Sequence, residues 1–350
     1  MTNDTIAADT LTGFARNILV AAGMREPHAQ IVSDTLVYAE LRGVSSHGLA
    51  RLPSYLDRVA AGAMELDPDM TVDGSFDAFR LLDAQNGFGQ IAACTAMDAA
   101  AAMARRHGIS AVSVRNSNHF GVAAYFVERA ARAGLVGIAL TNASPAMAPY
   151  NARTALIGTN PIAFGIPAGA QRPIVLDMST SLVARGKIRL AAMNGDAIPL
   201  GWAVDADGVP TTDAKAALDG HVAPMGGPKG AGLSLVIDIL TGVLSATALT
   251  GAVRNITDLG GPSRTGHLLL ALEPAAIGGA QSFARDVAAV ADRVHALEPV
   301  PGAQIRLPGE LEALAAERRT QEGIPLSPAV IAALQATAAR YGVPPLALAA

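Results

Sequence analysis

The sequence predicts an α/β (α+β) protein in which both ends of the chain contribute to one helical lobe. Three patterns lead to this prediction. Helical periodicity covers the N-terminal part, short apolar runs alternate with helical stretches from about Phe79, and a proline-punctuated connector after Glu298 leads into two more helices. We therefore expect a helical N-terminal unit over 1–72, an α/β domain over 73–300, and C-terminal helices over 301–350 that pack on the N-terminal unit.

The N-terminal unit is expected to contain three helices and no strand. Helices over 10–22 and 27–42 are indicated by the glycine that follows the first and the proline that opens the second. A third helix is expected from Ser46, a good N-cap residue, to Ala61, with a kink at Pro53.

The central domain is expected to alternate strands with helices. Its β-like runs lie at 79–82, 109–114, 135–140, 162–166 and 174–176, and its helices include 90–107 and 119–133. The apolar stretch 232–253 contains Asp238 and three glycines, so we interpret it as a buried helix and not as a membrane span. The last two helices are expected at 310–322 and 327–341.

The composition describes a well-buried globular protein. Hydrophobic residues make up 51% and charged residues 16% of the 350, and the net charge is −4 with Lys and Arg scattered. Such a chain has no basic patch for nucleic acid or an anionic membrane, which favours small-molecule chemistry. The single cysteine, Cys94, excludes an intrachain disulfide, and the polar, acidic start lacks the order of a signal peptide, so a cytoplasmic protein is expected.

Several motifs with known chemistry are absent from the sequence. There is no G-x-G-x-x-G after a strand, no Walker A sequence, no H-E-x-x-H and no G-x-S-x-G. The seven histidines are spread along the chain, and no two share a helix with a carboxylate at ligand spacing. A standard dinucleotide-binding turn, a hydrolase site and a metal site are therefore not expected.

The segment from Leu41 to Arg51 combines a proton-transfer group with an anion clamp. On one helix, His47, Arg51 and Tyr55 would be spaced i, i+4, i+8 and share one side. An imidazole at a helix start beside a guanidinium tends to have a lowered pKa, and the guanidinium can donate two parallel hydrogen bonds to a carboxylate. This pairing suits hydroxy-acid chemistry. The structural alternative is that Ser46 only caps the helix and that Arg51 pairs with a surface carboxylate.

Three further polar segments lie where ligands commonly bind. Residues 115–121 join a strand to a helix and leave N–H groups free, and Asp177 follows a strand, where it could hold ribose hydroxyls. Lys187 could bind a carboxylate or phosphate, and the glycine-rich turn 226–232 with Lys229 could bind a phosphate. Each segment also has a structural interpretation, with its polar residues serving as helix caps or as solvated lysines.

In this order, the segments resemble the malate/L-lactate dehydrogenase family of the second type, which is unrelated to the Rossmann-fold lactate and malate dehydrogenases. The resemblance runs from about residue 5 to 343 and rests on Leu41–Arg51, Asn118–Val122, Thr141–Pro145, Gly158–Pro161, Asp177–Ser181, Ala184–Ile188, Ile198–Trp202 and Gly226–Gly232. It implies a non-Rossmann NAD(P)-binding domain with a mixed sheet, and interconversion of 2-hydroxy and 2-oxo acids by hydride transfer. Because relatives are dimers, it also implies a homodimer.

Carried over residue by residue, the resemblance implies roles at an active site. His47 matches the proton donor or acceptor, Ser46 its hydrogen-bonded neighbour and Arg51 the clamp on the substrate carboxylate. His119 matches a second histidine that is sometimes assigned as the acid/base. With the spacing arguments above, the expected substrate contacts are Arg51, Tyr55, Thr159, Asn160 and Lys187. The expected cofactor contacts are His119, Phe120, Gly121, Val122, Ala123, Asp177, Met178, Ser179, Pro228, Lys229, Arg306, Leu307 and Pro308.

The sequence also departs from the family pattern. Imine-reducing relatives tend to carry an aspartate at the position of Lys187, as part of a Ser-His-Asp relay, so Lys187 favours a hydroxy acid, including one with a second anionic group. A cyclic imino-acid reductase (acting on piperideine- or pyrroline-2-carboxylate) and a non-catalytic nicotinamide-binding relative remain the alternatives. The substrate, the choice between NAD and NADP, the direction, and whether His47 or His119 is the main acid/base are left open.

Overall fold

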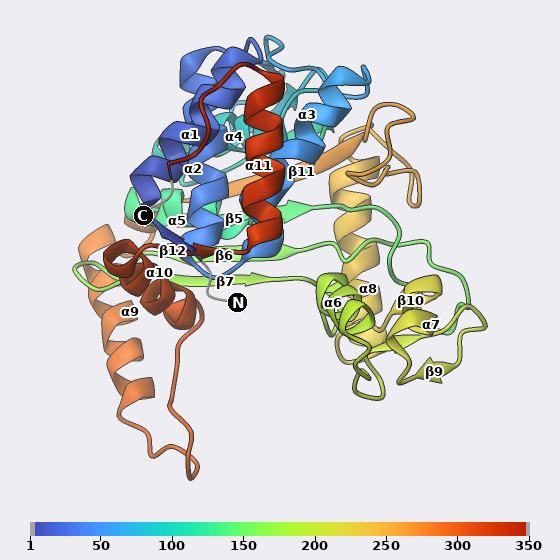
Figure 1. Ribbon diagram of the computed structural model, residues 1–350. Coiled ribbons are helices and arrows are strands. Elements are labelled where there is room, and N and C mark those ends of the chain that lie inside the picture. The colour runs from blue at the N-terminus through green and yellow to red at the C-terminus, as the bar shows by residue number, and fades with distance from the viewer. Residues whose placement is uncertain (1–3, 348–350) are drawn as a thin grey trace.

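The computed structural model describes residues 4–347, and its helical lobe joins the two ends of the chain (Figure 1). The lobe contains α1 (Ala8–Ala21), α2 (Glu26–Leu41), α3 (Leu52–Ala60) and α11 (Pro328–Arg340). The short strands β1 (Asp4–Ile6) and β12 (Ile324–Leu326) pair antiparallel and hold the two ends together. The apolar stripes of the helices share one core, in which Leu11, Leu36, Leu56 and Leu334 are fully buried.

A seven-stranded mixed sheet forms the centre of the molecule. Its order is β2 (Thr71–Asp73), β3 (Phe79–Asp83), β4 (Ile109–Ser117), β11 (Thr265–Leu272), β5 (Val136–Thr141), β6 (Ile162–Ile166) and β7 (Ile174–Met178). Only β3 and β4 run parallel among these neighbouring strands, and the other pairs are antiparallel. The predicted fold class, with a mixed sheet and a helical lobe, is confirmed.

Helices cover both faces of this sheet. On one face, α4 (Gly89–His107) packs against β4 and β11, and α5 (Ala124–Arg132) packs against β5 and β6. Fully buried alanines, among them Ala92, Ala96 and Ala100, let α4 approach closely. On the other face lie α8 (Pro228–Asp238) and the π-helical turn η3 (Ile239–Val243) that continues it. The helical lobe attaches to the first face through α2, which packs on α4.

A third, smaller unit follows β7 and has its own apolar core. It contains α6 (Arg185–Asn194), β8 (Ala203–Val204), β9 (Pro210–Thr211), α7 (Ala214–Asp219) and β10 (His221–Val222). After β11 the chain continues through η4 (Pro274–Ala276), α9 (Ala280–His295) and α10 (Glu310–Glu322). In Figure 1, α9 and α10 lie beside the edge of the sheet that ends with β7, away from the third unit.

Most of the predicted elements are confirmed, but the N-terminal unit and the centre of the sheet differ from the prediction. The N-terminal unit does contain a strand, β1, whose three residues are too few to show a pattern. The central strand β11 was not predicted, because a strand covered on both faces is an apolar run without alternation. The helix expected to begin at residue 119 begins at Ala124. The division at residues 72 and 300 stays a prediction.

The apolar stretch 232–253 is divided between α8, η3 and the turn that follows. Across residues 4–347, no helix combines the length and apolar character needed to cross a membrane.

Candidate active site

A cavity of about 1550 Å³ lies where the helical lobe, the sheet, the third unit and α10 meet. It exceeds the roughly 300–1,000 Å³ of pockets that hold one small ligand. Of the residues predicted for the site, those that line it are Ser46, His47, Arg51, His119, Phe120, Gly121, Val122, Ala123, Thr159, Asp177, Ser179, Arg306, Leu307 and Pro308. The structure thus brings together segments that are far apart in the sequence.

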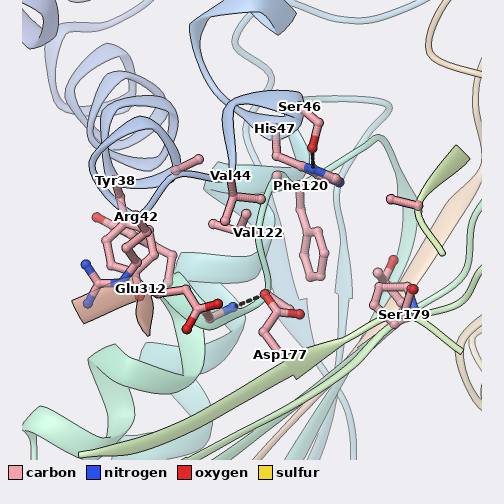
Figure 2. A pocket seen from close by; sticks show the side chains of 18 of the residues that line it. Tyr38, Arg42, Val44, Ser46, His47, Phe120, Val122, Asp177, Ser179 and Glu312 are labelled. Atoms are coloured by element: carbon pink, nitrogen blue, oxygen red, sulfur yellow. Dashed lines mark hydrogen bonds between the residues drawn. The ribbon is translucent and has the colours of Figure 1, made fainter. Parts of the chain in front are cut away.

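The segment that carries His47 is a pair of 3₁₀ turns and not the predicted kinked helix. The turns are η1 (Ser45–His47) and η2 (Leu49–Arg51), and α3 begins only at Leu52, with Pro53 in its first turn. Ser46 caps no helix, because its Oγ lies 2.9 Å from Nδ1 of His47 (Figure 2). Nε of Arg51 donates to the carbonyl oxygen of Ser46 at 2.6 Å, which leaves the rest of the guanidinium facing the cavity.

The buried carboxylate of Glu40 stabilises these turns. It is 1% exposed, and its Oε1 accepts a hydrogen bond from the N–H of Leu49 at 3.0 Å. A Cβ on Gly48 would lie 2.5 Å from Cδ of Glu40 and 2.8 Å from its Cγ, so only glycine fits between the turns and this carboxylate. Burial raises the pKa of Glu40. The position of His47 therefore depends on a close contact between Gly48 and a buried side chain.

His119 follows β4 and reaches the same part of the cavity from the sheet side. Its ring stacks on that of His47, with centroids 5.3 Å apart and an interplanar angle of 26°. Its Nδ1 lies 2.8 Å from the hydroxyl of Tyr55 and accepts a hydrogen bond from the N–H of Gly121 at 3.3 Å. Tyr55 is therefore beneath His119 and not on the cavity wall, where the sequence had predicted it.

Both histidines are neutral in this environment. Loss of hydration, with a contribution from the charge of Arg51, lowers the pKa of His47 to about 4. The pKa of His119 is lowered well below its usual value, mainly by burial and also by His47 and Arg51. A neutral imidazole can accept a proton directly, so the site is prepared for proton transfer in its resting state.

Phe120 is held in place by a third histidine, His267, which is buried. The ring of Phe120 stacks on that of His267, with centroids 4.6 Å apart and an interplanar angle of 6°. His267 lies in β11, is fully buried, and bonds through its two ring nitrogens to Ser117 at 2.8 Å and Thr141 at 2.7 Å. This contact explains how a strand that the sequence analysis missed supports the segment after His119.

Asp177 lies at the opposite side of the cavity, at the end of β7 (Figure 2). Its carboxylate accepts a hydrogen bond from the N–H of Ala124 at 2.8 Å, at the start of α5 and not of the following helix that the structural interpretation named, and it also faces the cavity. Partial desolvation at the cavity wall, together with the nearby Glu312, raises the pKa of Asp177 to about 6. The N-terminus of α5 and this carboxylate form a site suited to hydroxyl groups.

The segment Arg306–Pro308 borders β7. The carbonyl oxygen of Pro308 accepts a hydrogen bond from the N–H of Val175 at 3.2 Å. The next residue, Gly309, has a φ of +85°, and a Cβ there would meet the β7 backbone at 2.6 Å. The glycine therefore lets this segment lie close enough to the sheet edge for Arg306 to reach the cavity wall.

Six predicted site residues do not line the cavity: Tyr55, Asn160, Met178, Lys187, Pro228 and Lys229. Asn160 is fully buried and clamps the backbone, since it accepts from the N–H of Ala143 and donates to the carbonyl of Ser234, both at 2.9 Å. Met178 lies between Asp177 and Ser179, and alternation along a strand directs it to the other face.

Three of the six predicted site residues that do not line the cavity are exposed. Pro228 and Lys229 form the exposed first turn of α8, where the preceding glycines serve the chain reversal. Lys187 is exposed on α6, while its neighbours Arg185 and Arg189 line the cavity. The spacing i, i+4 of these two arginines could have indicated from the sequence that they share one face of a helix. Only the orientation of α6 decides whether that face meets the cavity.

Several arginines of the cavity have no carboxylate partner in the described part of the chain. Arg51 and Arg189 form no ion pair with any residue between 4 and 347, and Arg185 donates only to the carbonyl of Leu218, at 2.7 Å. Other arginines on the wall, such as Arg172 and Arg254, have carboxylate partners. Over the same described range, no cluster of three or more His, Cys, Asp or Glu residues is placed to hold a metal ion.

Comparison with known proteins agrees with this chemistry. A family model described as malate/L-lactate dehydrogenase matches residues 6–335. The chain is similar to an L-sulfolactate dehydrogenase of Methanothermobacter thermautotrophicus (36% identical, 89% of each chain) and to a Δ1-pyrroline-2-carboxylate reductase of Ancylobacter novellus (38% identical, 93% of this chain and 95% of the other). The solved sulfolactate dehydrogenase of Methanocaldococcus jannaschii superposes with a TM-score of 0.92 at 34% identity, over 97% of this chain and 98% of that one.

Proposed function

The chain belongs to the malate/L-lactate dehydrogenase family, NAD(P)-dependent oxidoreductases of 2-hydroxy and 2-oxo acids, and we propose that its substrate carries a second anionic group besides the 2-carboxylate. One observation carries this proposal. The cavity that contains the two histidines also contains Arg51, Arg185 and Arg189, none of which is neutralised by a carboxylate of the described chain.

The residues of the cavity fit a nicotinamide dinucleotide, either NAD or NADP. Its volume leaves room for a dinucleotide and an acid together. Asp177 offers a carboxylate to ribose hydroxyls, and the segment from Phe120 to Ala123 together with Arg306–Pro308 offers backbone, aromatic and cationic contacts. Gly121 has a φ of +82° and open space where a Cβ would stand, so a ligand can approach its backbone. The bound nucleotide supplies the hydride acceptor or donor.

The chain's own groups bind the acid and move the proton. The guanidinium of Arg51 would bind the 2-carboxylate in a bidentate manner and so orient C2. Neutral His47 would accept the hydroxyl proton during oxidation, and its protonated form would return it during reduction. Ser46 would keep the ring in place through Nδ1. Thr159, on the same wall, is the remaining predicted substrate contact.

The second anionic group would be bound by α6. Arg185 and Arg189 are one helical turn apart and both reach the cavity, whereas a substrate with one carboxylate would leave them unmatched. This argument weighs against the main alternative, a cyclic imino-acid reductase, which the similarity to a pyrroline-2-carboxylate reductase brings into consideration.

The test is a panel of initial rates at the NAD(P)H absorbance band. Oxaloacetate, 2-oxoglutarate, pyruvate and a cyclic imine are compared with both nucleotides, using wild-type protein, Arg189→Gln and the matched control Lys187→Gln. We expect turnover of the dianionic acids, a KM raised about tenfold or more by Arg189→Gln, and little change in Lys187→Gln. Preference for pyruvate or the imine, or equal effects of the two substitutions, would refute the proposal.

We also propose a cytoplasmic homodimer. Supporting the dimer, apolar side chains that are each 45–53% exposed lie at helical spacing on α8, on η3 and at the residue after η3: Val236, Ile239, Val243 and Leu244. The free, buried thiol of Cys94 suits a reducing compartment. Light scattering after gel filtration should give twice the monomer mass, and Val236→Glu with Val243→Glu should shift the protein to monomer. A monomeric wild-type protein would contradict the proposal.

A further inference from the structure

A buried chain of hydrogen bonds ends on His119. Nε2 of Gln90 donates to the hydroxyl of Tyr55 at 3.0 Å, and this hydroxyl lies 2.8 Å from Nδ1 of His119. The same Nδ1 accepts from the N–H of Gly121 at 3.3 Å. Gln90 and Tyr55 are at most 1% exposed and come from α4 and α3, so two elements fix one edge of the imidazole.

The donor and acceptor of each of these hydrogen bonds follow from the N–H of Gly121. A backbone N–H can only donate, so Nδ1 of His119 must be an acceptor and carries no proton. The hydroxyl of Tyr55 must then donate to Nδ1, and its oxygen is left to accept from Nε2 of Gln90. The neutral ring of His119 therefore holds its proton on Nε2.

The other edge of the ring is turned to the cavity. His119 lines the cavity, and Nε2 has no hydrogen-bond partner among residues 4–347 although it is not enclosed. The charged and titratable groups around the ring are Tyr55 from α3, His47 and Arg51 from the 3₁₀ turns, and His267 from β11. None of them is an anion that would stabilise a second proton on the ring.

We propose that Tyr55 and Gln90 are positioning residues that lock His119 in its Nε2–H tautomer, so that His119 donates a hydrogen bond to the reacting oxygen while His47 alone carries the proton. The proposal rests on the proposed function. A second proton on His119 would have to sit on Nδ1, where the N–H of Gly121 and the hydroxyl of Tyr55 already point. His47 differs, because its partner Ser46 is a hydroxyl that can donate or accept and so tolerates both charge states.

The tautomer can be measured without any turnover. In long-range ¹H–¹⁵N correlation spectra of the labelled wild-type protein, the ring signals of His119 are identified by their loss in His119→Gln. We expect Nδ1 to have the shift of an unprotonated nitrogen, Nε2 that of a protonated one, and no change through the neutral pH range. Tyr55→Phe should move the Nδ1 signal. A protonated Nδ1 in the wild-type protein overturns the proposal, whether or not a substrate has been found.

The division of roles is tested with variants that separate donation from titration. The carboxamide of His119→Gln can place an N–H near the position of Nε2 but cannot titrate, whereas His119→Leu has no donor. We expect His119→Gln to be about tenfold or more faster than His119→Leu and to keep the wild-type pH profile of kcat/KM. In His47→Gln, the pH dependence of kcat/KM should be lost. Equal loss in both His119 variants, or loss of the pH dependence in His119→Gln, would identify His119 as the proton carrier.

The role of Tyr55 is tested by coupling. Tyr55→Phe should lower kcat up to about tenfold in the wild-type background and leave nucleotide affinity unchanged. In the His119→Gln background the same change should have little further effect, because the ring that Tyr55 positions is gone. Tyr341→Phe, in the helical lobe, is the matched control for removing a tyrosine hydroxyl. If Tyr55→Phe costs the same in both backgrounds, Tyr55 contributes only to packing and the positioning role is wrong.

Discussion

Gly48→Ala is the substitution that most directly tests how the position of His47 is determined. Gly48 has a φ of −92° and a ψ of −149°, and an added methyl group there would meet a buried side chain. That methyl carbon would lie 2.5 Å from Cδ and 2.8 Å from Cγ of Glu40. Ordinary carbon–carbon contacts are about 3.5–4.0 Å, so one of the two segments must move.

Glu40 has little freedom to move. It is 1% exposed, and its carboxylate is bonded to the N–H of Leu49, inside the turn that would have to shift. Overpacking of this kind costs about 1–3 kcal/mol of unfolding free energy. A displacement of about 1 Å at the reacting group can lower the rate about 10²-fold. We therefore expect Gly48→Ala to lose stability and, more strongly, kcat/KM.

The assay combines urea unfolding with initial rates. In Gly48→Ala with Glu40→Ala, removal of the carboxylate should relieve the collision, so the double variant should be more stable than the sum of the single effects by about 1–3 kcal/mol. Gly13→Ala is the matched control, because its added Cβ meets nothing within 4 Å on α1 and should stabilise the helix by about 0.5–1 kcal/mol. Unchanged activity in Gly48→Ala, or additive stability effects, would refute this explanation.

Three other predictions follow from buried or titrating groups. Because burial lowers the pKa of His267 to about 3, the unfolded state binds a proton from about pH 6.5 downward and the folded state does not. Unfolding free energy should therefore fall by about 2–3 kcal/mol between pH ~7 and ~4.5, and urea titrations of His267→Gln should show a smaller fall. With the pKa of His47 at about 4, kcat/KM for oxo-acid reduction should decrease about tenfold for each pH unit above pH ~4, whereas kcat/KM for oxidation should not change with pH. A kcat/KM for reduction that is independent of pH would contradict this prediction. Arg58 is 1% exposed and donates to the carbonyls of Ala63 at 3.1 Å and Gly261 at 2.9 Å. Arg58→Met should therefore lower the free energy of unfolding in urea by about 2–4 kcal/mol. A loss below about 1 kcal/mol would show that these carbonyls find other partners.

The sequence could predict that residues chosen for their own chemistry lie at one site. His47, Arg51, His119 and Asp177 are polar side chains at element ends, and the structure brings all four to one cavity. Prediction failed where a role depends on a neighbour distant in the chain. Ser46 is a good helix cap by type, yet the chain here forms two 3₁₀ turns that lie against Glu40 at Gly48, and the hydroxyl of Ser46 bonds His47 instead.

Tertiary packing also decided which of several similar residues reach the site. Lys187 and Arg189 are both exposed cationic residues of α6, and only the orientation of that helix places Arg189, and not Lys187, on the cavity wall. Asn160 lies beside Thr159 in the sequence, but its side-chain amide is hydrogen-bonded to the backbone and does not face the cavity.

The sequence by itself determined the fold class, the helical lobe made from both chain ends and the family, because these depend on local periodicity and on residue types in a given order. The three-dimensional structure decided the place of β11 in the sheet, the geometry around His47 and the hydrogen-bond partners of His119. Each of these depends on contacts between segments far apart in the chain, such as Tyr55 with His119, and such contacts leave no pattern within a single segment.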